Sequence, residues 1–101
     1  MIAQYVRGLE NRSVADLKRI WPSLAGSQER AIQAEFDNAR SVQAAFNDPQ
    51  ISIDGDTSTV AGLRTYSVVT QDGHRLSRST KTTLTLRRSG DTWLIERVVH
   101  Q

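Results

Sequence analysis

Few acidic side chains of this sequence lie where they could transfer protons inside a folded domain. Two long runs rich in Thr, residues 57–70 and 75–88, contain neither Asp nor Glu. Five Asp residues fall at turns or strand breaks, where Asp is common because its side chain bonds to nearby backbone. Glu35 and Asp37, on either side of Phe36, remain as candidate general bases, with Tyr66 as a candidate hydrogen-bond donor.

Neither metal binding nor nucleophilic catalysis is indicated. The sequence has no Cys, and its two His, His74 and His100, show no metal-ligand spacing. A phosphate-binding loop and a Gly-x-Ser-x-Gly turn are also missing from the sequence. We therefore expect no metal and no cofactor.

Length and composition indicate one globular domain over residues 1–101, with 24% charged side chains. The formal net charge is only +2 and the basic residues are scattered, so we expect no nucleic-acid partner. No apolar run approaches the roughly 18 residues of a membrane span, so we expect no membrane partner. No leader peptide is visible, which favours a cytoplasmic location. Because helical pattern begins abruptly after Met1, we expect a truncated first helix in a domain excised from a larger protein.

Three amphipathic helices are expected before residue 40. Apolar residues at helical spacing form the face of the first helix, namely Ile2, Tyr5, Val6 and Leu9. Ser13 and Asp16 resemble a capping box that starts a second helix, and Pro22 stops it. Ser27 could cap a third helix, whose buried face would carry Ile32, Phe36 and Ala39.

Four strands are expected after residue 40, because the apolar period changes to two. The first starts at Arg40 and is interrupted at Asn47–Pro49. Three more strands follow, with turns at residues 54–56, 72–73 and 89–90, over Thr57–Thr70, Arg75–Arg88 and Thr92–His100. Helices followed by such a meander predict an α+β domain, with N-terminal helices packed on a four-stranded antiparallel sheet.

The length of the middle turn decides which side chains share a face of this sheet. A two-residue turn, Asp72-Gly73, would put Leu84 and Leu86 with Ala61, Leu63 and Val69. A three-residue turn, Asp72–His74, would put them with Val60, Arg64, Tyr66 and Val68. We favour the three-residue turn because it buries both the pair of isoleucines on the first strand and the apolar residues of the last hairpin against the helices. The united face would then carry Ile51, Ile53, Val60, Leu84, Leu86, Trp93 and Ile95.

The favoured register brings two arginines to the helix-covered face. Arg64 would lie opposite Thr82, Thr82 opposite Arg97, and Tyr66 opposite Thr80. Because an unpaired buried charge is costly, these arginines would need Glu35, Asp37 or an acidic ligand as a partner. A two-residue Ser89-Gly90 turn would further pair two apolar residues of the third strand with two of the fourth, Leu86 with Trp93 and Leu84 with Ile95.

The other face of the sheet would be rich in small, apolar and β-branched residues and poor in charge. Its members would be Ala61, Leu63, Thr65, Val69, Thr83, Thr85 and Leu94. A face of this kind favours burial against a second sheet, and a homodimer would bury it with two-fold symmetry.

Several stretches of the chain resemble the nuclear-transport-factor-2-like superfamily, also called the SnoaL-like or cystatin-like cone fold. They are Tyr5–Glu10, Ser13–Leu17, Ile51–Thr57 and, most characteristic, the ending Leu84–Ile95. The resemblance implies a strongly curved sheet wrapped round the helices, a conical pocket between them, and dimers through the convex face. The residues that we expect to line such a pocket, from the helix faces and the strand register, are Tyr5, Trp21, Arg64, Tyr66, Thr82 and Arg97.

The resemblance leaves the activity open, because the superfamily contains isomerases and dehydratases as well as non-catalytic modules of larger proteins. Its steroid isomerases carry an Asp on the sheet that has no counterpart here. We therefore expect a non-catalytic module for dimerisation and for a small anionic or amphipathic ligand, as the terminal domain of a bacterial regulatory protein such as a Ser/Thr kinase. The alternatives are a cofactor-independent isomerase or dehydratase using Glu35 or Asp37, and a protein-interaction adaptor with a filled cone.

Overall fold

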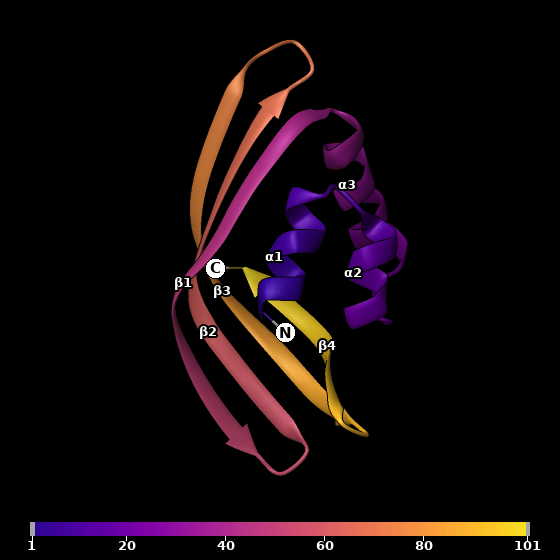
Figure 1. Ribbon diagram of the computed structural model, residues 1–101, viewed down its shortest axis with the longest axis vertical. Helices are drawn as coiled ribbons and strands as arrows, with labels where there is room; N and C mark the ends of the chain where they lie inside the picture. Colours follow the sequence, from indigo (N-terminus) through magenta and orange to yellow (C-terminus); the bar gives the residue numbers. More distant parts are fainter. Residues whose placement is uncertain (1, 101) are drawn as a thin grey trace.

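The computed structural model describes residues 2–100, which form three helices followed by one antiparallel sheet. The helices are α1 (Ile2–Glu10), α2 (Val14–Ile20) and α3 (Gly26–Asp37). The strands lie in the order β1 (Ala39–Asp54), β2 (Thr57–Thr70), β3 (Arg75–Ser89) and β4 (Thr92–His100). Figure 1 shows the sheet bent like a bow with all three helices on its concave side. The expected α+β architecture with a curved meander is confirmed.

Local chemistry explains where the helices begin and end. The Ser13 side chain accepts a hydrogen bond of 3.1 Å from the Asp16 N–H, which is half of the predicted capping box. The second helix ends at Ile20, just before Trp21 and Pro22, as proline requires. Ser27 does not cap α3, because the helix already starts at the preceding glycine and no side chain caps it.

The predicted interruption of the first strand is a β-bulge. Pairing of β1 with β2 shifts between Asn47 and Gln50, and Asp48 takes a left-handed φ of 53°. The ring of Phe46 lies against the backbone of Gly62, where a Cβ atom would collide with it. Glycine at this position therefore lets the bulged strand and its ring approach β2 closely.

The β2–β3 hairpin has the expected parity but a register shifted by two residues. Its three-residue turn is Gln71–Gly73, closed by a 2.8 Å hydrogen bond from the Thr70 N–H to the His74 carbonyl. Arg64 therefore pairs with Thr80 instead of Thr82, and Tyr66 pairs with Arg78 instead of Thr80. The parity survives because a shift of two residues keeps every side chain on its face.

The β3–β4 hairpin departs further from the expected pairing. Its turn is Gly90-Asp91, with the positive φ that a tight hairpin needs at Gly90, so Leu86 pairs with Ile95 instead of Trp93. A bulge follows at Glu96, and Leu84 pairs with Val98 instead of Ile95.

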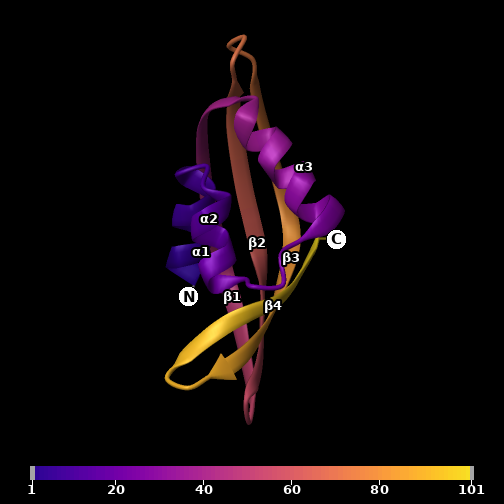
Figure 2. The same ribbon diagram turned by 90° about the vertical axis from the view of Figure 1, so that its right-hand side faces the viewer.

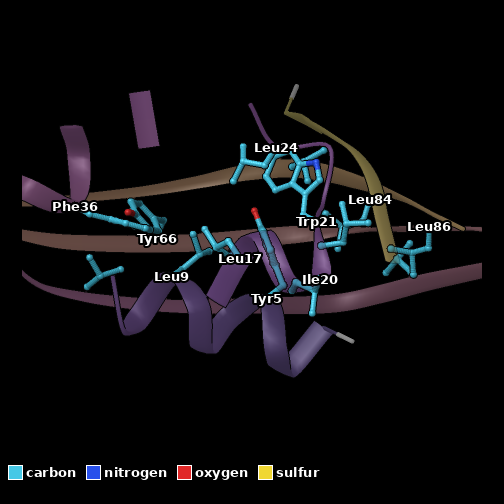
Figure 3. Close-up of a cluster of buried hydrophobic side chains, with 14 of the residues drawn as sticks. Tyr5, Leu9, Leu17, Ile20, Trp21, Leu24, Phe36, Tyr66, Leu84 and Leu86 are labelled. Carbon is cyan, nitrogen blue, oxygen red and sulfur yellow. The ribbon is translucent and has the colours of Figure 1, made fainter. Parts of the chain in front are cut away.

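The core lies between the helices and the concave face (Figure 3), with the middle of β2 and β3 as its floor. Val60, Leu84 and Leu86 are buried there as expected. Ile51 and Ile53 share this face but are 60% and 65% exposed, because the helices do not reach this end of the sheet (Figure 1). Within residues 2–100, no helix is long and apolar enough to cross a membrane.

Candidate functional site

A cavity of about 230 Å³ lies between the three helices and the concave face of the sheet. Its walls are mostly apolar and aromatic, and a small number of charged and polar groups enter it from the strands and from α3. The lining residues that carry the argument below are Tyr5, Trp21, Glu35, Arg64, Tyr66, Arg78 and His100.

Arg64 on β2 is the central cation of this cavity. Its Nη1 atom donates a hydrogen bond of 3.1 Å to the Tyr5 hydroxyl oxygen, and its Cζ atom lies 5.0 Å from the centroid of the Tyr66 ring. Its Nε atom is buried and has no acceptor within residues 2–100. A guanidinium has five N–H donors, so Arg64 has donors left for a ligand besides the one that the Tyr5 hydroxyl accepts.

Tyr5 on α1 and Trp21, directly after α2, are both buried and line the cavity. Figure 3 shows the hydroxyl of Tyr5 pointing away from α1 into the cluster that also contains Trp21. Burial raises the pKa of Tyr5 more than the neighbouring Arg64 cation lowers it. The hydroxyl is therefore protonated near neutral pH and can donate a hydrogen bond while it accepts one from Arg64.

Tyr66 and Glu35 form a polar edge of the cavity. Burial, and then the carboxylate of Glu35, raise the pKa of Tyr66 well above its usual range. Tyr66 is therefore a neutral hydrogen-bond donor. Glu35 comes from an exposed position on α3 and reaches the cavity at its rim.

Two titratable residues of the cavity lining, Arg78 and His100, were not among the expected site residues. Arg78 faces the cavity because it pairs with Tyr66, and His100 does so because the bulge at Glu96 changes the parity of β4. The one signal in the sequence was the spacing of Ile95 and Val98, which breaks strict alternation and is typical of a bulge.

The imidazole of His100 is held by the neighbouring strand. Its Nδ1 atom lies 2.9 Å from the Oγ1 atom of Thr82. Burial, and then the cations of Arg64 and Arg78, lower the pKa of His100. This imidazole is therefore neutral at pH 7.

Three of the expected residues lie outside the cavity lining. Arg97 is exposed and pairs with Thr85 on the convex face, because the bulge turns it away from the helices. Asp37 is exposed and accepts a 2.9 Å hydrogen bond from Gln33. Thr82 is buried beneath the cavity and holds His100.

The assembled site can bind an anion in a largely apolar chamber. Within residues 2–100, neither Arg64 nor Arg78 forms an ion pair with a carboxylate. The same residues contain no group of three side chains that could hold a metal ion. A carboxylate or similar group that reached both guanidinium groups would gain charge-assisted hydrogen bonds.

Comparison with solved structures finds the same fold at low identity. A nuclear transport factor 2-like superfamily protein from Salmonella enterica shares 11% identity over 99% of this chain and 84% of that one, with a TM-score of 0.85. A protein from Xanthomonas campestris, assigned as a calcium/calmodulin-dependent protein kinase II association domain, shares 12% over 97% and 79%, with a TM-score of 0.78. A protein from Streptomyces avermitilis, assigned as a dehydratase of the NTF2-like family, shares 17% over 97% and 88%, with a TM-score of 0.80.

Sequence comparison is decisive at the level of the family. Curated protein sequences contain no significant match to this chain. The sequence profile of the SnoaL-like domain, however, matches residues 21–100, which include α3, the whole sheet and most of the charged groups of the cavity. Because this match covers most of the chain, it shows that the chain belongs to the SnoaL-like domain family.

Proposed function

We propose that this domain is a non-catalytic module whose conical cavity binds a small organic anion. The observation that carries the proposal is Arg64, whose guanidinium lines an apolar chamber with one tyrosine as its hydrogen-bond acceptor and no carboxylate paired to it within residues 2–100. Arg64 is partly buried, and a cation that is withdrawn from water without a counter-ion costs free energy that a bound anion offsets. The second cation, Arg78, and the donor hydroxyl of Tyr5 would strengthen the binding.

The position of the acidic groups supports binding in preference to catalysis. Asp37 lies outside the cavity and is exposed. Glu35 reaches only the rim and is exposed, so neither carboxylate expected as a general base lies inside the cavity.

A titration with butyrate and benzoate tests this proposal directly. Both anions should shift the amide NMR signals of residues around Arg64, and butylamine should not. Arg64→Gln should weaken binding by about ten- to a hundredfold, because a hydrogen bond to a charged group contributes roughly 1.5–3 kcal/mol. Arg97→Gln removes an exposed arginine from the convex face and is the matched control. Equal binding by the two variants would contradict the proposal.

Catalysis by the same cavity is the second candidate function. It is favoured by Glu35 and Tyr66, which bring an acceptor and a neutral hydroxyl donor to one rim, and by the shared fold with a protein assigned as a dehydratase. If this candidate is correct, Glu35→Gln should abolish turnover of an isomerisable or dehydratable carboxylate while its binding is preserved. A filled-cone adaptor is less well supported, because the cavity has room for a ligand.

We also propose that the convex face joins two copies of this domain. Leu63 and Val99 are exposed on this face. Ala61 on β2 pairs with Thr83 on β3, and Thr83 pairs in turn with Val99 on β4. The fold shared with a protein assigned as a kinase association domain supports an assembly role within a larger regulatory protein. Sedimentation at micromolar concentration should detect a dimer that Leu63→Arg dissociates. A monomeric wild-type protein would refute the dimer while leaving the ligand site untouched.

A further inference from the structure

A second cavity of about 340 Å³ adjoins the first, between α3 and the projecting part of the β2–β3 hairpin. Figure 2 shows α3 lying over β2 and β3, with the tip of the hairpin extending beyond it. The two cavities share three lining residues, namely Glu35, Tyr66 and Arg78. The remaining walls of the second cavity come from Ala34, Asn38, Val68, Thr70 and Leu76.

The volumes suggest that one ligand occupies both cavities. At about 230 Å³, the first cavity is smaller than the roughly 300–1,000 Å³ of typical small-molecule sites. The first cavity alone is suited to a head group or a short acid. With the adjoining 340 Å³, the combined space falls inside that range.

The boundary between the cavities consists of one buried ring and two exposed side chains. Tyr66 is buried, so its ring forms a floor common to both cavities. Glu35 on α3 and Arg78 on β3 are exposed residues, and within residues 2–100 no ion pair joins them. Exposed long side chains change rotamer on the nanosecond scale, so this boundary can open without movement of the backbone.

The second cavity offers apolar surface and little charge beyond the two shared residues. Leu76 is 58% exposed although it lies on the concave face, where it pairs with the buried Val68. An apolar chain lying along Val68 and Leu76 would cover this leucine. Arg64 lines the first cavity, and its buried Nε donor lacks an acceptor within residues 2–100. The charged end of a ligand is therefore expected in the first cavity.

We propose that the ligand of this domain is an elongated amphipathic monocarboxylate that spans both cavities. Its carboxylate pairs with Arg64 in the first cavity, and its apolar tail passes over the Tyr66 ring, between Glu35 and Arg78, into the second cavity. This inference rests on the proposed function of the first cavity and adds to it the shape of the ligand and the path of its tail.

A chain-length series of butyrate, hexanoate, octanoate and decanoate, measured by calorimetry below the micellar range, tests the inference. Affinity should rise roughly fourfold for each methylene group that enters the second cavity. Decanoate should also shift the amide signals of Asn38 and Leu76, which butyrate leaves unchanged. Decanol should bind at least tenfold more weakly than decanoate, and equal binding of the two would overturn the head-group assignment.

Two pairs of variants locate the tail. Ala34→Phe fills the second cavity and should weaken decanoate binding about tenfold while leaving butyrate binding unchanged. Ala15→Phe, at an exposed position of α2 outside both cavities, is its control. Leu76→Gln should weaken decanoate binding, and Ile53→Gln, at an exposed position outside both cavities, should not. Circular dichroism of each variant establishes that it is folded.

The outcomes separate the two proposals. If no carboxylate binds, or if Arg64→Gln binds them all as the wild type does, the proposed function of the first cavity is wrong. If butyrate binds through Arg64 but affinity does not rise with chain length, or if Ala34→Phe and Ala15→Phe behave alike, only the inference about the second cavity is overturned.

Discussion

The concave face of this sheet has two parts that share one alternation pattern and differ in burial. The covered part, which includes Val60, Tyr66 and Leu84, lies under the helices and is buried. The open end, formed by Ile51 and Ile53, lies beyond the bulge of β1 and is largely exposed (Figure 1). Alternation therefore assigns a side chain to a face, whereas coverage by another element decides whether that side chain belongs to the core.

Truncation of one large apolar side chain in each part should give the largest difference in the free energy of unfolding. Leu84 is 0% exposed, so Leu84→Ala should reduce the free energy of unfolding by about 2–5 kcal/mol through lost burial and a residual cavity. Ile53→Ala at the open end should cost less than about 1 kcal/mol, because much of its side chain already contacts water. Urea unfolding of both variants measures the contrast. Equal losses would mean that the open end is covered in solution.

Removal of the Tyr5 hydroxyl tests how much the hydrogen bond from Arg64 contributes to the stability of the covered part. Tyr5→Phe deletes the acceptor of Arg64 and should cost about 1.5–3 kcal/mol, because a charged donor is left without a partner. Thr59→Val removes a hydroxyl at an exposed position and is the control. An unchanged unfolding midpoint for Tyr5→Phe would show that water already satisfies Arg64.

A single methyl group at the bulge should disturb the boundary between the two parts. Gly62→Ala places a Cβ against the Phe46 ring and the Asn47 carbonyl oxygen, and should cost about 1–3 kcal/mol by overpacking. The adjacent Ala61→Val, on the other face, should change stability by less than about 0.5 kcal/mol. Thermal unfolding compares them, and a neutral Gly62→Ala would show that Phe46 moves aside freely.

The smallest expected effect is a pH dependence that arises in the covered part. The pKa of His100 is lowered in the folded protein, so the unfolded chain, with an ordinary histidine pKa of about 6.5, takes up this proton at a higher pH. Stability rises with pH wherever the unfolded state binds more protons. The contribution of His100 should therefore weaken the fold as pH falls below about 7, until the folded imidazole is itself protonated.

His100→Gln should flatten this pH dependence. Urea unfolding of the variant and the wild type at pH 7, 6 and 5 measures it, and NMR titration of the imidazole checks the direction of the shift. Parallel pH profiles would rule out His100 as the source.

The elements were more predictable than the contacts between them. Ser13, Pro22 and the break at Asn47–Pro49 act on neighbouring backbone, so their effects could be read locally. The parity that placed Arg64 and Tyr66 inside was also correct, since a two-residue change of register leaves the faces unchanged.

The wrong assignments among the strand-borne site residues come from changes of register between strands. The bulge at Glu96 removed Arg97 from the expected site and brought His100 into it, because one extra residue reverses the parity of everything after it. The two-residue shift at the middle hairpin put Arg78, instead of Thr80, opposite Tyr66. The spacing of Ile95 and Val98 was the signal of the bulge, whereas no alternation pattern reports the shift at the middle hairpin, because a shift of two residues leaves every side chain on its face.

The amino-acid sequence by itself determined the order of helices and strands, the curved-sheet family and the side of β2 that carries Arg64. These properties follow from spacing and backbone preference within short segments. Only the tertiary structure decided which charged groups meet in the cavity, that a second cavity adjoins it, and that Ile51 and Ile53 stay exposed. These depend on the register between strands and on the reach of the helices over the sheet, which are set by packing between distant segments.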